Sequence, residues 1–431
     1  MNTRKSENLE RRFSVDLLSN YVALSILGVS GLAINIIIAG QYGATALGVF
    51  NQAYAVYVLA SQFAVVGVHH STLKHVAEYV GSDVKLAPII RSALLLSLFT
   101  GILTAAAVFT GAQIFGIAFN SEQVAQAIMY AAPGLLCFAL NKVNFSVING
   151  LRHMKLFAAA QAARFVLVVG FVIAASAYGL PAEMLTISFS LTEIILVMFL
   201  TPYSLICGGP GGGGFRKWFH RHAVFGARSF LGGFLLEANL RIDVLMIGIL
   251  SSDIMVGVYS LAATFIEGFY NLLNVVRNNV NPLLVQWMRD KRLDLLYAFR
   301  RKTCFYIFPL TALAGIALIS VYPTIISFIS DNQIFDEGWV PLIFLVSGIV
   351  FYSGTLPFDT ILLQAGHPGS HTLFVGAVTA TNITFNLIAI PYLGLTGAAL
   401  ATASSMLFGV LYLNIFLKHR VGFTLFQLRH Q

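Results

Sequence analysis

The sequence predicts an all-α integral membrane protein of about 12 transmembrane helices, arranged as two pseudo-symmetric six-helix lobes. Its composition is the first indication, because 57% of the 431 residues are hydrophobic and only 10% are charged. Apolar runs long enough to cross a bilayer then recur along the whole chain, and a glycine-rich stretch divides them near the midpoint. The alternating pattern of a membrane β-barrel is absent, so we expect the spans to be helices.

Each expected span is a predominantly apolar run, and about 20 such residues are needed to cross a hydrocarbon core of roughly 30 Å. The expected spans are 17–40, 46–68, 88–112, 124–149, 156–178, 182–206, 224–250, 254–281, 303–329, 339–363, 371–391 and 395–417.

The loops between these spans differ in charge. One set of segments contains Arg4, Lys5, Arg11, Arg12, Lys74, Lys85, Arg152, Lys155, Arg216, Lys217, Arg221, Arg289, Lys291, Arg292, Arg300, Arg301, Lys302, Lys418, Arg420 and Arg429. The opposite loops contain no Lys or Arg and carry Glu122, Glu183, Asp253, Asp331, Asp336 and Glu337. Because basic loops stay in the cytosol, we expect both termini there. The net charge of +8 then reflects topology and requires no nucleic-acid partner.

No pattern in the sequence predicts an enzyme, a cofactor or a metal site. A phosphate-binding glycine loop followed by Lys and Ser or Thr is absent, which argues against a built-in ATPase. His69, His70 and His75 lie at a membrane edge and are expected to be solvated. The cysteines lack the spacing of metal ligands.

The chain divides at a low-complexity segment. Cys207 is followed by Gly-Gly-Pro-Gly-Gly-Gly-Gly, which has the composition of a flexible linker. We therefore expect an N-terminal lobe of residues 1–207, a cytosolic linker and basic segment of residues 208–222, and a C-terminal lobe of residues 223–431.

A weak internal repeat supports this division. Ala33–Phe50 aligns with Arg241–Tyr259 when one residue is inserted, and Asn149–Arg152 aligns more loosely with Gln364–His367. The first alignment matches Ile34, Asn35, Gly40, Gly48 and Phe50 with Ile242, Asp243, Gly248, Gly257 and Tyr259. An even number of spans in each half makes the repeats parallel, so we expect a pseudo-two-fold axis along the membrane normal and a cavity between the halves.

One expected span carries an unbroken polar stripe. The stripe consists of Ser260, Thr264, Glu267, Asn271, Asn274, Asn278 and Asn281. Spacings of three and four residues place these side chains on one helical face, over a length of roughly 32 Å. Such a face predicts contact with a hydrated lumen. The alternative is that the amides only join this helix to its neighbours.

Charged residues deep in the membrane are functional candidates, because burying an uncompensated charge there costs several kcal/mol. The deep candidates are Lys142, Arg164, Glu193, Glu237, Arg241, Asp243 and Glu267. Arg277 and Asp359 lie nearer the cytosolic end, where their side chains can reach the interface.

Lys142 and Arg164 flank an expected cytosolic hairpin at equal distances from His153. Two antiparallel helices would hold both cations at similar depth, where they could receive a phosphate or pyrophosphate. The alternative is that each pairs with a carboxylate such as Glu193 or Glu267.

In the seventh expected span Glu237 and Arg241 are four residues apart, which favours an ion pair within one helix. Asp243 lies about 200° around the helix from Arg241, so it needs a partner from another helix or from water. Asp243 is therefore a candidate gate contact or proton site. Glu193 shares a face with Ser190 and is either a coupling carboxylate or a buried hydrogen-bonded acid.

Two groups of residues resemble motifs of polysaccharide exporters. The first is Gly43, Ala46–Phe50, Gly67 and Lys74–Glu78, and the second is Arg241–Asp243 leading to Gly257–Tyr259. The whole chain is similar to the Wzx-type oligosaccharide flippases, the polysaccharide transporter branch of the MATE-like MOP exporter superfamily. The resemblance implies a MATE-like fold. Peptidoglycan-precursor flippases of the superfamily usually have two further spans, which this chain lacks.

Flippases of this branch move undecaprenyl-pyrophosphate-linked oligosaccharides across the bacterial inner membrane. The resemblance therefore implies a non-enzymatic, alternating-access flippase that serves O-antigen (lipopolysaccharide), exopolysaccharide or capsule synthesis. Implied partners are the lipid-linked glycan, a coupling ion (H+ or Na+), membrane lipids, and the polymerase and chain-length proteins. The resemblance implies a cationic substrate cavity with Lys142, Arg164, Arg241 and Arg277, and the polar stripe adds Asn271 and Asn274 as candidate contacts to sugar hydroxyls. The candidate coupling or gating residues are the carboxylates in or near the membrane, Glu193, Asp243, Glu267 and Asp359.

Two alternatives remain open from the sequence. A cation-coupled multidrug extruder of the same fold would use Glu193, Asp243 and Glu267 as coupling carboxylates. A membrane glycan polymerase or transferase is the other alternative. The short outer loops argue against it, because they leave little room for an active site.

Overall fold

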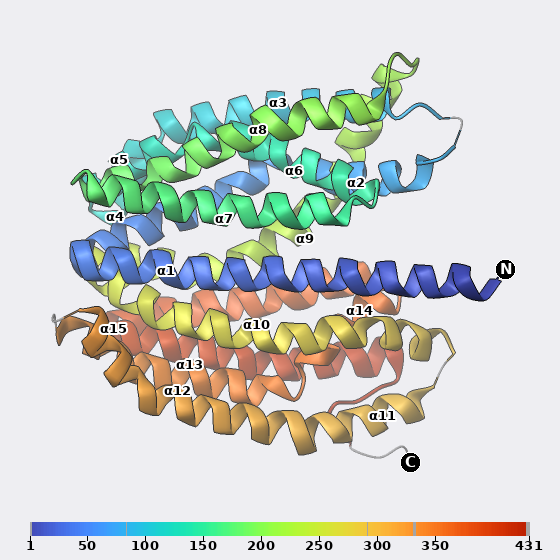
Figure 1. Cartoon of the computed structure of the whole chain (residues 1–431). Helices are drawn as coiled ribbons and strands as arrows, with labels where there is room; N and C mark the ends of the chain where they lie inside the picture. The colour runs from blue at the N-terminus through green and yellow to red at the C-terminus, as the bar shows by residue number, and fades with distance from the viewer. Residues whose placement is uncertain (1, 83, 291, 331–332, 428–431) are drawn as a thin grey trace. The chain divides into compact units, whose positions relative to one another are not determined.

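The computed structural model describes residues 2–82, 84–290, 292–330 and 333–427, with side chains from residue 28 onwards. The basic residues before residue 28, and Lys291, Asp331 and Arg429, which entered the prediction of orientation, lie outside the described side chains. Every regular element in the described part of the chain is helical (Figure 1). The all-α prediction is therefore confirmed for these residues.

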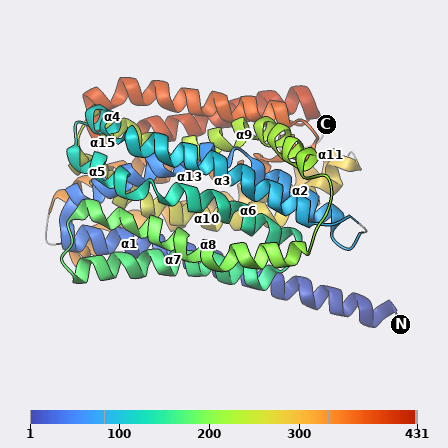
Figure 2. The same cartoon turned by 90° about the horizontal axis from the view of Figure 1, so that it is seen from above.

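The chain forms two compact units. Unit 1 comprises residues up to Ile37 together with Ala53–Phe234, and unit 2 comprises Ile38–Gln52 together with the residues from Leu235 onwards. Helix α1 (Asn2–Val65) and helix α9 (Phe215–Leu250) each contribute to both units. Within each unit the long helices run side by side (Figures 1 and 2).

Unit 1 also contains α2 (Val68–Tyr79), α3 (Ala87–Thr110), α4 (Ala112–Phe119), α5 (Glu122–Ala131), α6 (Gly134–Gly150), α7 (Met154–Ala177), η1 (Ala182–Thr186) and α8 (Ile187–Gly208). Helix α6 packs against α2, α3 and α8. Apolar residues of α2, α3 and α6, such as Val76, Ile90 and Val143, form a core that also includes Trp218 of α9.

Unit 2 also contains α10 (Asp253–Arg289), α11 (Leu293–Lys302), the π-helical turn η2 (Thr303–Ile307), α12 (Phe308–Ile329), η3 (Gln333–Gly338), α13 (Trp339–Ser353), η4 (Leu356–Phe358), α14 (Ile361–Gln364) and α15 (Pro368–Val421). Helix α13 packs against α12 and α15. Leu284, Leu296, Phe358, Leu413 and Phe423 belong to the largest described core of this unit.

The described residues contain eight helices that are long and apolar enough to cross a membrane, or nine if the bent pair α5 and α6 is one span. The expected number was about 12. The two numbers differ partly because α1 and α15 each run through two expected spans. Gly43 (φ 82°, ψ −175°) and Gly394 (φ 55°, ψ −129°) interrupt the helical backbone at the boundaries between those spans. Helix α9, which carries several charges, is not among the eight.

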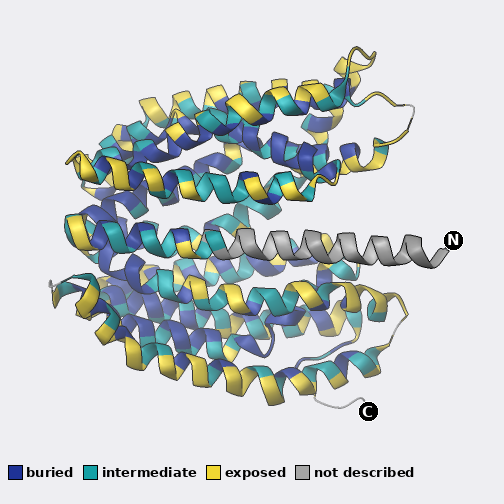
Figure 3. Ribbon diagram, in the orientation of Figure 1, coloured by how far each residue is buried: buried dark blue, intermediate teal, exposed yellow. Residues whose placement is uncertain are grey.

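Exposed residues occur along the helices of both units (Figure 3). Many of them carry large apolar side chains. Ile117 is 82% exposed, Phe328 86% and Tyr392 84%. Exposure of this extent is unfavourable in water and favourable in lipid. The structure therefore supports a multi-pass membrane protein.

The two glycines matched by the internal repeat, Gly48 and Gly257, lie against each other in unit 2. A Cβ atom on Gly48 would lie 1.8 Å from the carbonyl oxygen of Asp253, and one on Gly257 would lie 1.9 Å from that of Ala44. Only glycine permits this approach of α1 to α10. Beside the crossing, Gln52 Nε2 donates a hydrogen bond to Asp253 Oδ1 at 2.7 Å.

Candidate functional site

The candidate carboxylate of unit 1 is Glu193 of α8, which is buried and 4% exposed. Arg164 of α7 approaches it with both ends of its guanidinium: Nε lies 2.8 Å from Oε1, and Nη2 donates to Oε2 at 3.0 Å. Asn141 of α6 donates Nδ2 to the same Oε2 at 2.7 Å and to the Glu193 carbonyl at 2.9 Å. Three helices therefore meet at one charge-assisted cluster.

Aromatic rings cover the guanidinium of Arg164. Its Cζ lies 5.2 Å from the centre of the Phe138 ring and 4.7 Å from that of Phe145. The ammonium of Lys142 lies 5.4 Å from the Phe138 ring. Of the two alternatives that the sequence left open for Arg164, the structure shows the ion pair with a carboxylate. Lys142 is half-buried, and its role in anion binding stays a prediction.

Asp243 of α9 has a different environment. Oδ1 accepts a hydrogen bond from Asn386 Nδ2 at 2.9 Å, and Oδ2 accepts from Thr402 Oγ1 at 2.5 Å and from Tyr259 Oη at 3.0 Å. Asn386 also contacts Asn382 one turn earlier in α15. Among the described residues all the hydrogen-bond donors shown for this carboxylate are neutral. The partners come from α10 and α15, as expected for a residue that faces away from Arg241.

Arg241 forms an ion pair with Glu267 of α10, with Nη1 3.1 Å from Oε1. The four-residue spacing predicted a pair with Glu237 of the same helix, and that prediction was wrong. Residues four apart on a helix can meet, but Glu267 of the neighbouring helix carries the same negative charge as Glu237 and can pair with the guanidinium instead. The Glu267 side chain is 51% exposed and that of Arg241 is 18% exposed, so the pair is accessible on the side of its carboxylate.

Arg277, like Arg164 and Arg241, forms an ion pair, and its partner is Asp359. Arg277 Nη1 of α10 donates to Oδ2 of Asp359, which lies between η4 and α14, at 2.9 Å. From their positions in the sequence, each side chain was expected to be able to reach the interface alone, whereas in the structure the two form an ion pair. Nearby, Thr360 donates to Asn281 Oδ1 at 2.7 Å. This end of the polar stripe is therefore held to the segment around α14.

The stripe from Ser260 to Asn281 lies on one continuous helix, α10, as the spacing predicts. Ser260 is buried, whereas Glu267, Asn271 and Asn278 are exposed. Asn274 is half-buried and donates to Asn271 at 3.5 Å. The middle of the stripe therefore presents carboxylate and amide groups that an incoming molecule can reach.

Sequence reasoning missed the polar partners on α15. Asn382 and Asn386 are four residues apart within an expected span, and Thr402 follows in the next. Two amides at this spacing inside an apolar segment indicate a buried polar face, and that signal could have identified them. In the described residues, no three His, Cys, Asp or Glu side chains group as metal ligands.

Solved structures define the class of fold. The chain superposes on the lipid II flippase MurJ, in an inward closed conformation, with a TM-score of 0.73 and 16% identity, covering 94% of this chain and 87% of that one. An inward-facing MATE-family multidrug resistance transporter of the MOP superfamily superposes with a TM-score of 0.70 and 15% identity. The match covers 93% of this chain and 99% of that one. The Vibrio cholerae MATE transporter VcmN, in the bent form, superposes with a TM-score of 0.57 and 10% identity. The match covers 99% of this chain and 100% of that one. The fold is therefore MATE-like.

The sequence also matches a family profile described as polysaccharide biosynthesis protein, over residues 82–329. The chain belongs to this family, and the resemblance to polysaccharide exporters is confirmed. No curated protein sequence matches the chain.

Proposed function

We propose that this protein is an alternating-access flippase that moves undecaprenyl-pyrophosphate-linked oligosaccharides across the bacterial inner membrane. The observation that carries the proposal is that a member of a polysaccharide-biosynthesis family has the fold of membrane flippases and transporters. A polysaccharide assembled on a lipid carrier requires a step that moves the polar glycan through the hydrocarbon core. The product would be O-antigen, exopolysaccharide or capsule.

The proposal includes a membrane arrangement. Twelve spans form two six-helix lobes, with both termini in the cytosol. Reporter fusions test this topology: a reporter after Glu122 or Asp253 is expected to lie outside the cytosol, and one after Gly212 within it. An external reporter after Gly212 would overturn the proposed orientation.

The accessible middle of the α10 stripe is the proposed glycan contact. Asn271 and Asn274 supply amide donors and acceptors that suit sugar hydroxyls. The half-buried amide of Asn274 reaches Asn271 only at 3.5 Å, a weak contact that a sugar hydroxyl can replace.

The proposed pyrophosphate ligands include three arginines, and each can be ranked by how easily a pyrophosphate could replace its carboxylate partner. Arg241 pairs with Glu267, whose carboxylate is half-exposed, so this ion pair is the least buried of the three and a pyrophosphate can compete for the guanidinium most easily there. Arg164 pairs with the buried Glu193, and separating such a pair costs about 3–5 kcal/mol. We therefore assign substrate contact first to Arg241. Lys142 and Arg277 are the next candidates, and Arg164 mainly positions α6, α7 and α8.

Asp243 is the proposed coupling residue. Its three neutral donors hold the carboxylate in place without compensating its charge. A proton or a sodium ion bound there would remove the charge and change the hydrogen bonding between α9, α10 and α15. Glu193, Glu267 and Asp359 each have an arginine partner, which makes them weaker candidates for this role.

A cation-coupled multidrug extruder is the second candidate, because the fold is shared with MATE transporters and Asp243 would serve coupling equally well. Proteoliposome assays separate the two functions. The first follows the movement of a fluorescent undecaprenyl-pyrophosphate oligosaccharide, and the second follows efflux of a cationic dye. Glycan movement without dye efflux supports the flippase, and dye efflux without glycan movement would overturn it.

Matched variants extend the assay to the residues. Arg241→Gln combined with Glu267→Gln removes the accessible pair without changing net charge, and we expect glycan movement to fall at least about tenfold. The control is Arg292→Gln combined with Asp294→Gln, which removes an exposed pair at the start of α11. Asp243→Asn keeps the shape of the carboxylate and is expected to abolish ion-driven movement. Normal rates in both variants would exclude these roles.

A further inference from the structure

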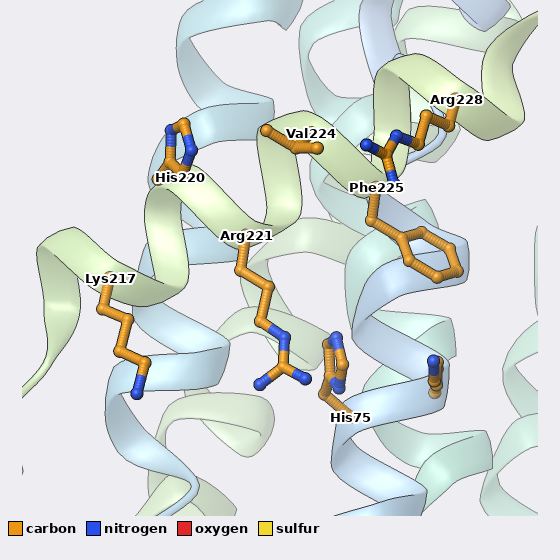
Figure 4. Close-up of a pocket in the computed structure, with 8 residues that line it drawn as sticks. His75, Lys217, His220, Arg221, Val224, Phe225 and Arg228 are labelled. Carbon is orange, nitrogen blue, oxygen red and sulfur yellow. The ribbon is translucent and has the colours of Figure 1, made fainter.

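A concave surface lined by basic and apolar side chains lies at the junction of α2 and the first four turns of α9, wholly within unit 1 (Figure 4). Its volume is about 460 Å³. We call it the α2–α9 pocket, and it is lined by Lys74, His75, Lys217, His220, Arg221, Val224, Phe225 and Arg228. None of these residues belongs to the site proposed above.

The cations come from one face of α9 and one position of α2. Lys217, Arg221 and Arg228 are spaced by four and seven residues, which places them along a single helical face over roughly 16 Å. Lys74 of α2 adds a fourth charge, with its ammonium 5.4 Å from the Phe225 ring. In Figure 4 the Arg221 side chain extends from α9 toward His75 of α2.

This positive charge is not balanced by acids. In the part of the chain that the structure describes, the ion pairs formed by carboxylates do not include Lys74, Lys217, Arg221 or Arg228. The nearest acid along α2, Glu78, contacts His75 instead, with 3.2 Å between Oε2 and Nδ1. Lys217 and Arg221 also lie near the N-terminus of α9, where the helix dipole is positive and disfavours cations. A bound anion would relieve both kinds of repulsion.

Buried contacts hold the pocket in shape before any ligand arrives. His222 of α9 accepts a hydrogen bond from Ser71 at 2.9 Å and donates one to the Ile89 carbonyl at 3.1 Å. A Cβ atom on Gly226 would lie 2.4 Å from the Val66 carbonyl oxygen, so the backbone of α9 touches the turn that precedes α2. Trp218 is buried between the same helices. A preformed pocket avoids part of the entropic cost of ordering its ligand contacts.

The walls of the pocket indicate a lipid rather than a free anion. Val224 and Phe225 lie between the cations, and Val224 is 37% exposed. An apolar strip beside basic residues suits a molecule that carries a phosphate and an acyl chain. The pocket also lies at the expected boundary of the membrane, because the seventh expected span begins at Val224.

We propose that the α2–α9 pocket binds the phosphate-bearing head group of an anionic phospholipid. The length of the cationic face, roughly 16 Å, exceeds one phosphate and favours a head group with two, as in cardiolipin. The proposal does not depend on which molecule the protein transports.

The test compares lipids retained by the full-length protein in nanodiscs of phosphatidylcholine that contain a few per cent cardiolipin or phosphatidylglycerol. Native mass spectrometry counts the bound lipids. We expect cardiolipin to be retained in preference to phosphatidylglycerol and phosphatidylcholine. The triple variant Lys217→Gln, Arg221→Gln, Arg228→Gln is expected to weaken this binding by on the order of 100-fold, because each cation near an anionic surface contributes about a factor of five.

Two matched variants control for charge and folding. Arg301→Gln, Lys302→Gln, Lys418→Gln removes the same charge from exposed positions of unit 2 and is expected to change binding less than about twofold. The charge-preserving variant Arg221→Lys, Arg228→Lys is expected to retain most of it. Equal losses in the two triple variants, or no preference for anionic lipid, would overturn the proposal. Binding of inorganic pyrophosphate in the pocket without any retained lipid would also overturn the proposal.

Discussion

Glu193 in unit 1 and Asp243 in unit 2 are both carboxylates held by side chains of two other helices, but their partners differ. Glu193 contacts a guanidinium and an amide, so the ion pair is neutral as a whole. Asp243 contacts an amide and two hydroxyls, so its negative charge has no cation among the described contacts. The first arrangement compensates the charge of the carboxylate within the protein. The second leaves a charge that a proton or a small cation can neutralise, which is why we assign coupling to Asp243.

Removing Arg164, the cation that pairs with Glu193, should have the largest effect on stability. Arg164→Gln leaves Glu193 buried with an uncompensated charge, and we expect a loss of about 3–5 kcal/mol in stability. The melting temperature and the folded fraction after purification measure this loss. Arg164→Gln combined with Glu193→Gln is the control and should recover most of it. Full stability of the single variant would show that the pair is not structural.

A buried neutral group extends the comparison to acid pH. Burial lowers the pKa of His222, which precedes the expected span, to about 4. The hydrogen bond to the Ile89 carbonyl opposes this shift, and His75 and Arg221 add smaller lowering contributions. The unfolded chain binds the proton near pH 6.5, so stability is complete above that value and is lost as pH falls toward 4. The loss is on the order of 3 kcal/mol. His222→Gln should flatten the dependence of melting temperature on pH between 6.5 and 4. An unchanged slope would contradict this assignment.

Removing one donor from each carboxylate compares the two environments directly. Asn386→Ala deprives Asp243 of its amide partner and is expected to cost about 1–3 kcal/mol, because a buried acceptor then loses a hydrogen bond and has no arginine partner. Asn141→Ala removes the matching amide from Glu193, and Arg164 still compensates the charge, so the expected cost is about 1 kcal/mol. Thermal denaturation of both variants measures the difference. The reverse order would contradict the distinction drawn between the two carboxylates.

The smallest effect is expected where an ion pair is accessible. Arg241→Gln breaks the contact with the half-exposed Glu267 and should change stability by about 0–1 kcal/mol. The same denaturation experiment measures it. A loss as large as that of Arg164→Gln would show that Arg241 is structural, and would weaken its assignment to substrate.

The sequence by itself determined the features that depend on neighbours along the chain. Apolar runs predicted helices, and the spacing of polar residues placed the stripe on one face of α10. These predictions succeed because the period of the α-helix fixes which residues share a face.

Only the tertiary structure decided which helix supplies the partner of each charge. Arg241 meets Glu267 rather than the expected Glu237, Arg277 meets Asp359, and Asp243 reaches Asn386 and Thr402 far along the chain. The physical reason is that a helix sequence specifies the face that a side chain occupies but not the helix that packs against it. For a buried charge, that neighbour determines whether the charge is compensated, and therefore whether the residue stabilises the fold or remains available to a ligand.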